Sequence, residues 1–311
     1  MKIIHIFNTR YSLRFLFLIF FFTIHYYNCS AQNIGFKIAA NTLSGGTGVF
    51  MRDDDPDLIK EAMPFGLKTY EAILEKNPDH KPLLLSTATG FCSYAYLLQN
   101  DAEQIINNNY DEHLLLKSRA KKLYIRCRDY ALRALEIDHP GFQKKIQNNN
   151  NDTGKSILSE TDTDDSPYLY WAGAGWAGAI NLDKSDTGML INLPIAGMLL
   201  ERVIQINDTF NEGAAYDLLL SYEASRPGGD LNKARHYYDK ALKISKGKRA
   251  SLYLNLAENV SVREQNLEEF KNLLDLALSI EVNAYPELTL ENSIARRRAL
   301  WLKKITSDLF F

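Results

Sequence analysis

A short pattern of small and apolar residues recurs at helical spacing along most of this chain. Three residues separated by four and then three positions lie on one face of a helix, so each copy forms a stripe on which a second helix can pack. The copies are Gly66, Tyr70, Ile73; Cys127, Ala131, Ala134; Ala196, Leu200, Val203; Ala234, Tyr238, Ala241; and Phe270, Leu274, Ala277. The recurrence predicts repeated helical hairpins rather than an irregular bundle.

The spacing between copies indicates a particular repeat. The last three copies begin 38 and then 36 residues apart, near the roughly 34-residue period of the tetratricopeptide repeat (TPR). Almost every ordered segment has apolar residues at helical spacing, and no run alternates as a strand does. We predict an all-α, TPR-like solenoid of about four hairpins with flanking helices, forming one domain over 32–311. Helices are expected over 55–76, 82–98, 112–137, 168–180, 187–206, 210–224, 231–245, 249–262, 266–280 and 289–308.

One polar segment interrupts the helical pattern. Residues 143–166, QKKIQNNNNDTGKSILSETDTDDS, are rich in Asn, Asp and Thr and offer little apolar surface to bury. We expect a mobile insertion between two helices.

The first 31 residues have the order of a secretory signal: three basic residues, an apolar run over 15–24, then small or polar residues. The apolar run is too short to span a bilayer, and we expect no other membrane-spanning segment. Two processing routes fit the residues equally. Either Cys29 is acylated as the N-terminus of a lipoprotein, or cleavage follows Ala31. The residues before Cys29, Tyr-Tyr-Asn, match the lipoprotein motif poorly.

Charge and motifs argue against several functions. Signal removal takes three of 36 basic residues and none of 38 acidic ones, leaving a net charge of about −5 without general attraction for nucleic acid. The remaining histidines form no metal-ligand pair, and GxSxG and Walker motifs are absent. We predict no catalytic residue, metal or cofactor. Cys92 and Cys127 are most simply small buried residues; in an oxidising compartment a disulfide between them is the alternative.

The segment YLYWAGAGWAG at 168–178 places three glycines inside a helix, each costing about 1 kcal/mol relative to Ala. We favour close helix packing as the explanation. The alternative, compatible with the first, is an apolar ligand cavity. Its candidate lining residues are Tyr94, Tyr96, Tyr170, Trp171, Trp176 and Tyr222. Basic residues at 296–298 are explained by a solvated helix face.

The stretch EASRPGGD at 223–230 separates two expected helices. Pro227 ends the first, Gly228 and Gly229 allow a tight reversal, and Asp230 caps the second. It is longer than a typical TPR turn, which leaves Arg226 on a projecting loop beside a helix N-terminus. We therefore predict Arg226 as a contact for a carboxylate ligand or a partner.

Several stretches resemble the T component of TRAP-type (tripartite ATP-independent periplasmic) transporters. They are KIAANTLSGGTGVF (37–50), DDDPDLIKEAMPFGLKTYEAILEKNPDHKPLLL (53–85), GFCSYAYLLQ (90–99), RCRDYALRALE (126–136), YWAGAGWAGAINLDKSD (170–186) and EASRPGGDLNKARHYYDKALKIS (223–245). Together they cover nearly the whole mature chain. The resemblance implies an all-helical periplasmic lipoprotein that associates with the transporter's solute-binding protein. The insertion at 143–166 and the weak lipoprotein motif depart from the family.

The resemblance also implies import of small hydrophobic organic acids, a channel through each subunit and, in some members, a homotrimer. It favours acylation of Cys29 and hence a lipid anchor at the periplasmic face of the envelope. The expected function is a noncatalytic accessory role in a TRAP-type system. The alternatives are an envelope enzyme, such as a hydrolase, and a purely structural assembly scaffold.

Overall fold

The computed structural model describes residues 37–148 and 151–311, and these are α-helical almost throughout. The expected signal segment 1–31, including Cys29, lies outside the described residues. No strand occurs in the described ranges, so the prediction of an all-α fold is confirmed.

Residues 37–44 are helical, and the labelled helices follow them. The helices are α2 (Thr47–Met51), α3 (Pro56–Lys76), α4 (Lys81–Ile105), α5 (Tyr110–Asp138), α6 (Phe142–Ile146), α7 (Asn151–Ser159), α8 (Ser166–Leu182), α9 (Thr187–Leu190), α10 (Leu193–Ile206), α11 (Ala214–Ser225), α12 (Leu231–Ser245), α13 (Ala250–Leu256), α14 (Leu267–Ser279), α15 (Thr289–Lys304) and α16 (Thr306–Leu309). The short turns are η1 (Thr163–Asp165), η2 (Phe210–Gly213), η3 (Ala257–Ser261, a π-helical continuation of α13), η4 (Val282–Ala284) and η5 (Pro286–Leu288).

The helices pack as consecutive pairs: α4 with α5, α8 with α10, α11 with α12, and α13 with α14. The recurring triplets lie on α3 and on the second helix of each pair, and all their residues except Gly66 and Tyr238 are buried. This is where the spacing predicts a packing stripe. The identity of these pairs as TPR units stays a prediction.

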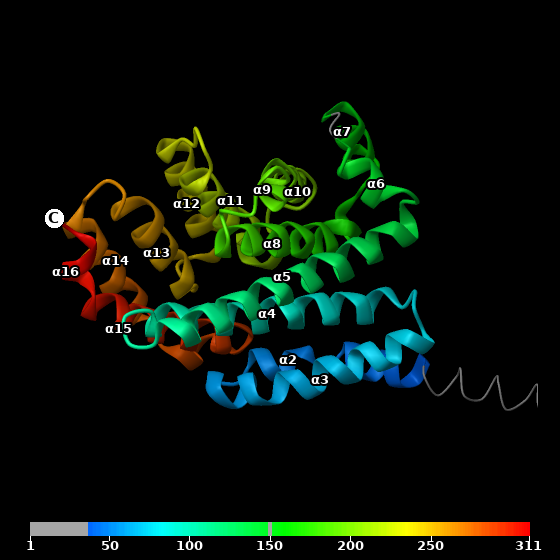
Figure 1. Cartoon of the computed structure of the whole chain (residues 1–311), viewed down its shortest axis with the longest axis horizontal. Coiled ribbons are helices and arrows are strands. Elements are labelled where there is room, and N and C mark those ends of the chain that lie inside the picture. The colour runs from blue at the N-terminus through cyan, green and yellow to red at the C-terminus, as the bar shows by residue number, and fades with distance from the viewer. Residues whose placement is uncertain (1–36, 149–150) are drawn as a thin grey trace, which may run out of the picture.

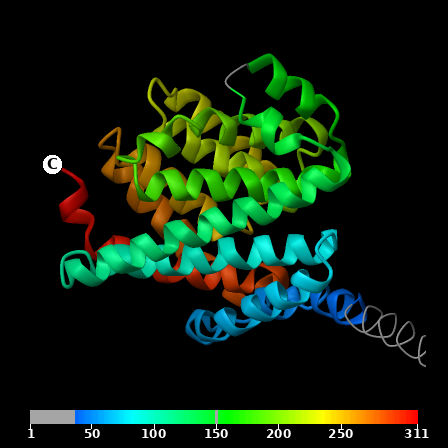
Figure 2. The ribbon, with the colours of Figure 1, turned by 45° about the vertical axis from the view of Figure 1, so that its right-hand side comes forward.

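The first helices of these pairs, together with α15, form a closed circuit. Helix α4 contacts α8, α8 contacts α11, α11 contacts α13, α13 contacts α15, and α15 returns to α4. Figure 1 shows α3, α4, α5 and α8 stacked in that order, with α13, α14 and α15 at one end. The turned view in Figure 2 again places α15 alongside α3 and α4. The inner faces of the circuit helices therefore meet around one interior.

The segment 143–166 differs from the expected unstructured insertion. It contains most of α6, together with α7 and η1, and the Ile146, Ile157 and Leu158 side chains are buried in the main core. Asp162 and Asp165 form a reciprocal capping box around η1. A prediction from polar composition misses this order, because the few apolar residues of the segment share one face of short helices and are buried together.

By length and hydropathy, Thr187–Ile206 is apolar enough to cross a membrane, contrary to expectation. The structure breaks this stretch between α9 and α10, and α10 packs against α8 and α11. Its Ala196, Leu199 and Leu200 are fully buried. The 33% of the stretch that is buried lies mainly on one face of α10, which packs on the core.

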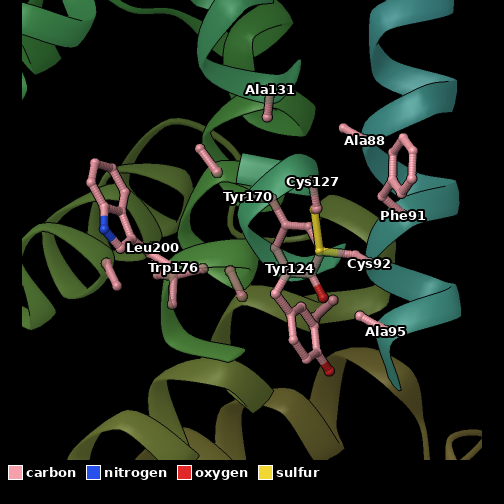
Figure 3. Close-up of a cluster of buried hydrophobic side chains, with 14 of the residues drawn as sticks. Ala88, Phe91, Cys92, Ala95, Tyr124, Cys127, Ala131, Tyr170, Trp176 and Leu200 are labelled. Carbon is pink, nitrogen blue, oxygen red and sulfur yellow. A yellow bond between two sulfur atoms is a disulfide. The ribbon is translucent and has the colours of Figure 1, made fainter. Parts of the chain in front are cut away.

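Cys92 of α4 and Cys127 of α5 form a disulfide. Both are buried, with exposed fractions of 3% and 0%, and Figure 3 shows the bond between the two helices. The residues are therefore small core residues and also a covalent link between the helices of the first pair.

Candidate functional site

Tyr96 of α4 marks the lining of the interior. It keeps 37% of its surface exposed, yet burial raises its pKa to about 12. Its charged neighbours are Arg298 and Glu291 of α15, the helix that follows α4 in the circuit, and Glu258 of η3. Tyr96 is therefore a partly exposed side chain that many protein atoms surround, and desolvation by those atoms raises its pKa.

Two further tyrosines lie near Tyr96. Tyr170 of α8 is 7% exposed, and burial strongly raises its pKa although Arg249 opposes the shift. Tyr124 of α5 donates a hydrogen bond to Gln99 of α4 at 3.0 Å, and its pKa is raised by burial and, to a smaller extent, by the nearby Tyr96 and Tyr170. Figure 3 shows Tyr124 and Tyr170 beside the disulfide. The wall therefore combines aromatic faces with hydroxyl groups.

Arg298 joins α15 to η3 and to α4. Its Nε lies 3.1 and 3.2 Å from the two carboxylate oxygens of Glu258, and its guanidinium also pairs with Glu103 of α4. The guanidinium lies over the Trp301 ring, 4.5 Å from its centre. Glu258 is presented by the π-helical turn η3, a geometry often found at functional sites. The expectation of a wholly solvated face at 296–298 is wrong for Arg298, whose side chain is 11% exposed.

Arg249, just before α13, is fixed in the same wall. Its Nε and Nη2 donate to the two oxygens of Glu291 at 2.9 and 3.1 Å, and its Nη1 donates to the Asn211 carbonyl at 2.9 Å. Asn211 and Glu212 adopt positive φ angles of 44° and 53°, and in this conformation the Asn211 carbonyl oxygen points toward Arg249. Arg249 is 6% exposed and the Glu291 side chain is 26% exposed, so the guanidinium is buried and the carboxylate is half-buried.

Asp217 of α11 is held differently. Its Oδ1 accepts a hydrogen bond from Asn255 Nδ2 at 2.6 Å, and the Ser221 hydroxyl donates to Asn255 Oδ1 at 2.7 Å. Asp217 forms no ion pair with any residue that the structure describes. Burial raises its pKa, although its side chain retains some exposed surface. Like Tyr96, it is a partly exposed group whose pKa is raised by the protein around it.

The structure brings some predicted site residues together and separates others. Tyr96 and Tyr170 share the wall, and Trp171 packs edge-on against Tyr170 with ring centres 4.9 Å apart. Tyr94 is buried and accepts a hydrogen bond from Arg119 at 2.7 Å. Trp176 is 1% exposed beneath Arg128 and lies apart from the tyrosines in Figure 3. Tyr222 is half-buried against Gly197.

Arg226 is engaged within its own turn. Its Nη2 lies 2.8 Å from Glu223 Oε2, and Glu223, 1% exposed, also pairs with Lys233 at 2.9 Å. The reversal follows the predicted chemistry: Gly228 has a φ of 69°, and Asp230 caps α12 by accepting from Asn232 N–H. Contact of Arg226 with a ligand or partner stays a prediction. An incoming carboxylate would have to compete with Glu223 for the Arg226 guanidinium.

The glycines of α8 confirm the close-packing explanation. A Cβ on Gly175 would lie 2.7 Å from the backbone of Tyr124 and Arg128, and one on Gly178 would lie 2.7 Å from the Tyr124 ring. A Cβ on Gly173 would lie 3.0 Å from Leu200. The glycines thus allow α8 to approach α5 and α10 closely and set the position of Tyr124 in the wall.

We expect Gly175→Ala to lower the free energy of unfolding by about 1–3 kcal/mol, because the new methyl group meets backbone that cannot rotate away. Gly66→Ala in α3 is the matched control. A Cβ there meets nothing within 4 Å, so the better helix propensity of Ala should raise the free energy of unfolding by up to about 1 kcal/mol. Urea unfolding of both variants measures the difference, and equal effects would contradict the packing explanation.

Sequence reasoning missed most of the charged wall. Asp217 lies on α11, Arg249 and Glu258 lie just before and just after α13, and Glu291 lies on α15, and they share no motif or spacing. Each resembles an ordinary polar residue of an amphipathic helix. They meet only because the circuit closes.

These features define an all-helical protein whose circuit of helices encloses an aromatic and charged interior. Comparison with known proteins identifies its family. The model for the TRAP transporter T-component matches residues 52–310, and the chain belongs to that family. It is also 28% identical over 300 residues to an uncharacterized protein of Treponema pallidum (strain Nichols), covering 91% of this chain and 93% of that protein. The chain is therefore a component of a TRAP-type transport system.

Proposed function

We propose that this protein is a noncatalytic accessory component that docks the periplasmic solute-binding protein of a TRAP transporter and takes a small, largely apolar solute into its interior. Family membership supports the transport role. The observation that carries the solute site is Tyr96, which is solvent-exposed yet surrounded by side chains from α15 and η3. The family resemblance points to an organic acid as the solute.

The placement of the protein follows from the same proposal. A lipid anchor at Cys29 would hold the domain at the periplasmic face of the membrane, and cleavage after Ala31 would release it as a soluble periplasmic protein. TPR-like pairs expose an extended surface for a partner, and a homotrimer would place several such surfaces around one axis.

A hydrolase is the second candidate, and Asp217 is the observation that favours it. A carboxyl group with a raised pKa inside a cavity fits a general acid or base. The hydrogen-bond partner of the Asp217 carboxylate is an amide, from Asn255. Hydrolysis of small esters or amides by the wild type, lost in Asp217→Asn, would favour the enzyme over the transport component.

Native mass spectrometry of mature protein purified from its own envelope tests the solute site. We expect a folded protein that retains a small molecule, released on denaturation, with the acyl group and subunit number visible in the same spectrum. Tyr96→Trp is a variant that fills the space beside Arg298, and it should reduce the retained fraction. Tyr285→Trp, a change at an exposed tyrosine of the surface, should leave it unchanged. Loss of the molecule in both variants, or in neither, would contradict an interior site.

A further inference from the structure

The turn between α4 and α5 carries apolar side chains that the fold leaves uncovered. Ile106, Tyr110, Leu114 and Leu115 are 42%, 61%, 43% and 72% exposed. They lie outside the main core and outside the half-buried side chains that pack against it. Apolar side chains gathered on the surface of a soluble domain mark a site of interaction with another molecule.

A groove opens where α14 and α15 meet α16. Its volume is about 640 Å³, and its apolar lining includes Leu267, Leu274 and Phe310. Phe310 is held in place by an edge-on contact with the buried Phe270, with ring centres 5.0 Å apart. The groove is therefore a preformed apolar surface.

The charges in this groove are not balanced. Lys303 and Asp275 both line it and pair with each other at 2.6 Å. Lys271 also lines it, is exposed, and forms no ion pair with any residue that the structure describes. An apolar floor with a charged group at its rim is the usual composition of a surface that docks another protein, and Lys271 suits an acidic residue of the partner.

The turn and the groove lie at one end of the molecule, and the described chain begins at the other. Asn41 contacts His80 at the start of α4, with Oδ1 and Nε2 2.7 Å apart. Helix α4 then runs for 25 residues, about 37 Å, and near its far end Glu103 pairs with Arg298 of α15. Figures 1 and 2 both show α16 and the α4–α5 turn at the end opposite the first described residues. We call this the distal end.

The expected lipid anchor indicates what can reach the distal end. Cys29 precedes Lys37 by eight residues, and eight residues span at most about 29 Å. An acylated Cys29 would therefore keep the beginning of the described chain close to the membrane. The distal end would face away from the lipid, where a soluble periplasmic protein can approach it.

We propose that the distal end is the surface that docks the solute-binding protein, with an apolar projection of the partner in the α14–α16 groove and an acidic group of the partner beside Lys271. This inference rests on the proposed function, because it assumes both docking and the lipid anchor. It adds the face of the molecule on which docking takes place. The α4–α5 turn would extend the contact beyond the groove.

Titration calorimetry at neutral pH and low salt tests the surface, using the full mature chain and the purified solute-binding protein of its TRAP transporter. Leu115→Glu places a charge in the apolar turn, and Lys271→Glu reverses the charge at the groove. We expect each variant to weaken binding by about tenfold or more. Both side chains are exposed, so the urea unfolding midpoints should stay at the wild-type value.

Matched controls make the same two changes at the opposite end. Ile38 is 61% exposed and Lys37 is exposed, and both lie in the helix that carries Asn41. Ile38→Glu and Lys37→Glu should leave the affinity for the solute-binding protein within about twofold of the wild type.

The outcomes separate the docking surface from docking itself. Failure of the wild type to bind the solute-binding protein would overturn both. Wild-type binding that Leu115→Glu and Lys271→Glu leave unchanged, or that the control variants weaken equally, would overturn the distal surface and leave docking standing. A change in subunit number of Leu115→Glu in sedimentation velocity without the partner would identify the distal end as a contact between copies of this chain, and would also overturn the proposal.

Discussion

Replacing Arg249 by Met is expected to lower the free energy of unfolding by about 3 kcal/mol, because it leaves the half-buried Glu291 without its ionic partner. Arg249 is 6% exposed and links α13 to Glu291 of α15 and to the Asn211 carbonyl of η2. Its loss therefore weakens the circuit at two contacts. Urea unfolding followed by circular dichroism measures the change.

Two further variants separate burial from ion pairing. Lys303 pairs with Asp275 on the surface, where the side chains are 45% and 65% exposed, so Lys303→Met should cost less than about 1 kcal/mol. Adding Glu291→Leu to Arg249→Met removes the unpaired carboxylate and should recover part of the lost stability. A similar loss from Arg249→Met and Lys303→Met would show that the fork does not behave as a buried pair.

Removal of the disulfide by Cys92→Ala and Cys127→Ala together is expected to cost about 2–4 kcal/mol, since the bond closes a loop with a sequence separation of 35 residues. Comparison of the oxidised wild type with the double variant in urea measures this cost. Because both cysteines are buried, reductant should act on the native protein only as it unfolds. An unchanged unfolding midpoint in the double variant would mean that the bond adds no stability. A disulfide of this kind also fits export to an oxidising compartment.

The sequence predicted the helical pairs well because their packing stripes are local. A residue such as Ala131 or Leu200 is recognisable from its neighbours three and four positions away, and both are fully buried in the structure. The turn at Gly228 was likewise predictable, because its positive φ of 69° suits glycine.

The interior wall could not be predicted in the same way. Asp217, Arg249 and Arg298 meet through contacts between helices that are far apart in sequence, and nothing in the local pattern separates them from solvated side chains. Tyr96 and Tyr170 were found from their residue type. That they lie beside a charged cluster was not predictable, because it follows from the contact between α15 and α4.

The segment 143–166 shows the opposite error. Composition dominated the prediction, although Ile146, Ile157 and Leu158 are enough to bury one face of two short helices against the core. Composition gives the average cost of ordering a segment, whereas burial depends on a few correctly placed side chains.

Capture from native membranes tests the proposed role in transport most directly. Tagged full-length protein, isolated from its own envelope in mild detergent, would be compared with an unrelated envelope protein carrying the same tag. Quantitative mass spectrometry then identifies the associated proteins. The predicted result is specific enrichment of the solute-binding protein of a TRAP transporter, and its repeated absence after mild cross-linking would contradict docking.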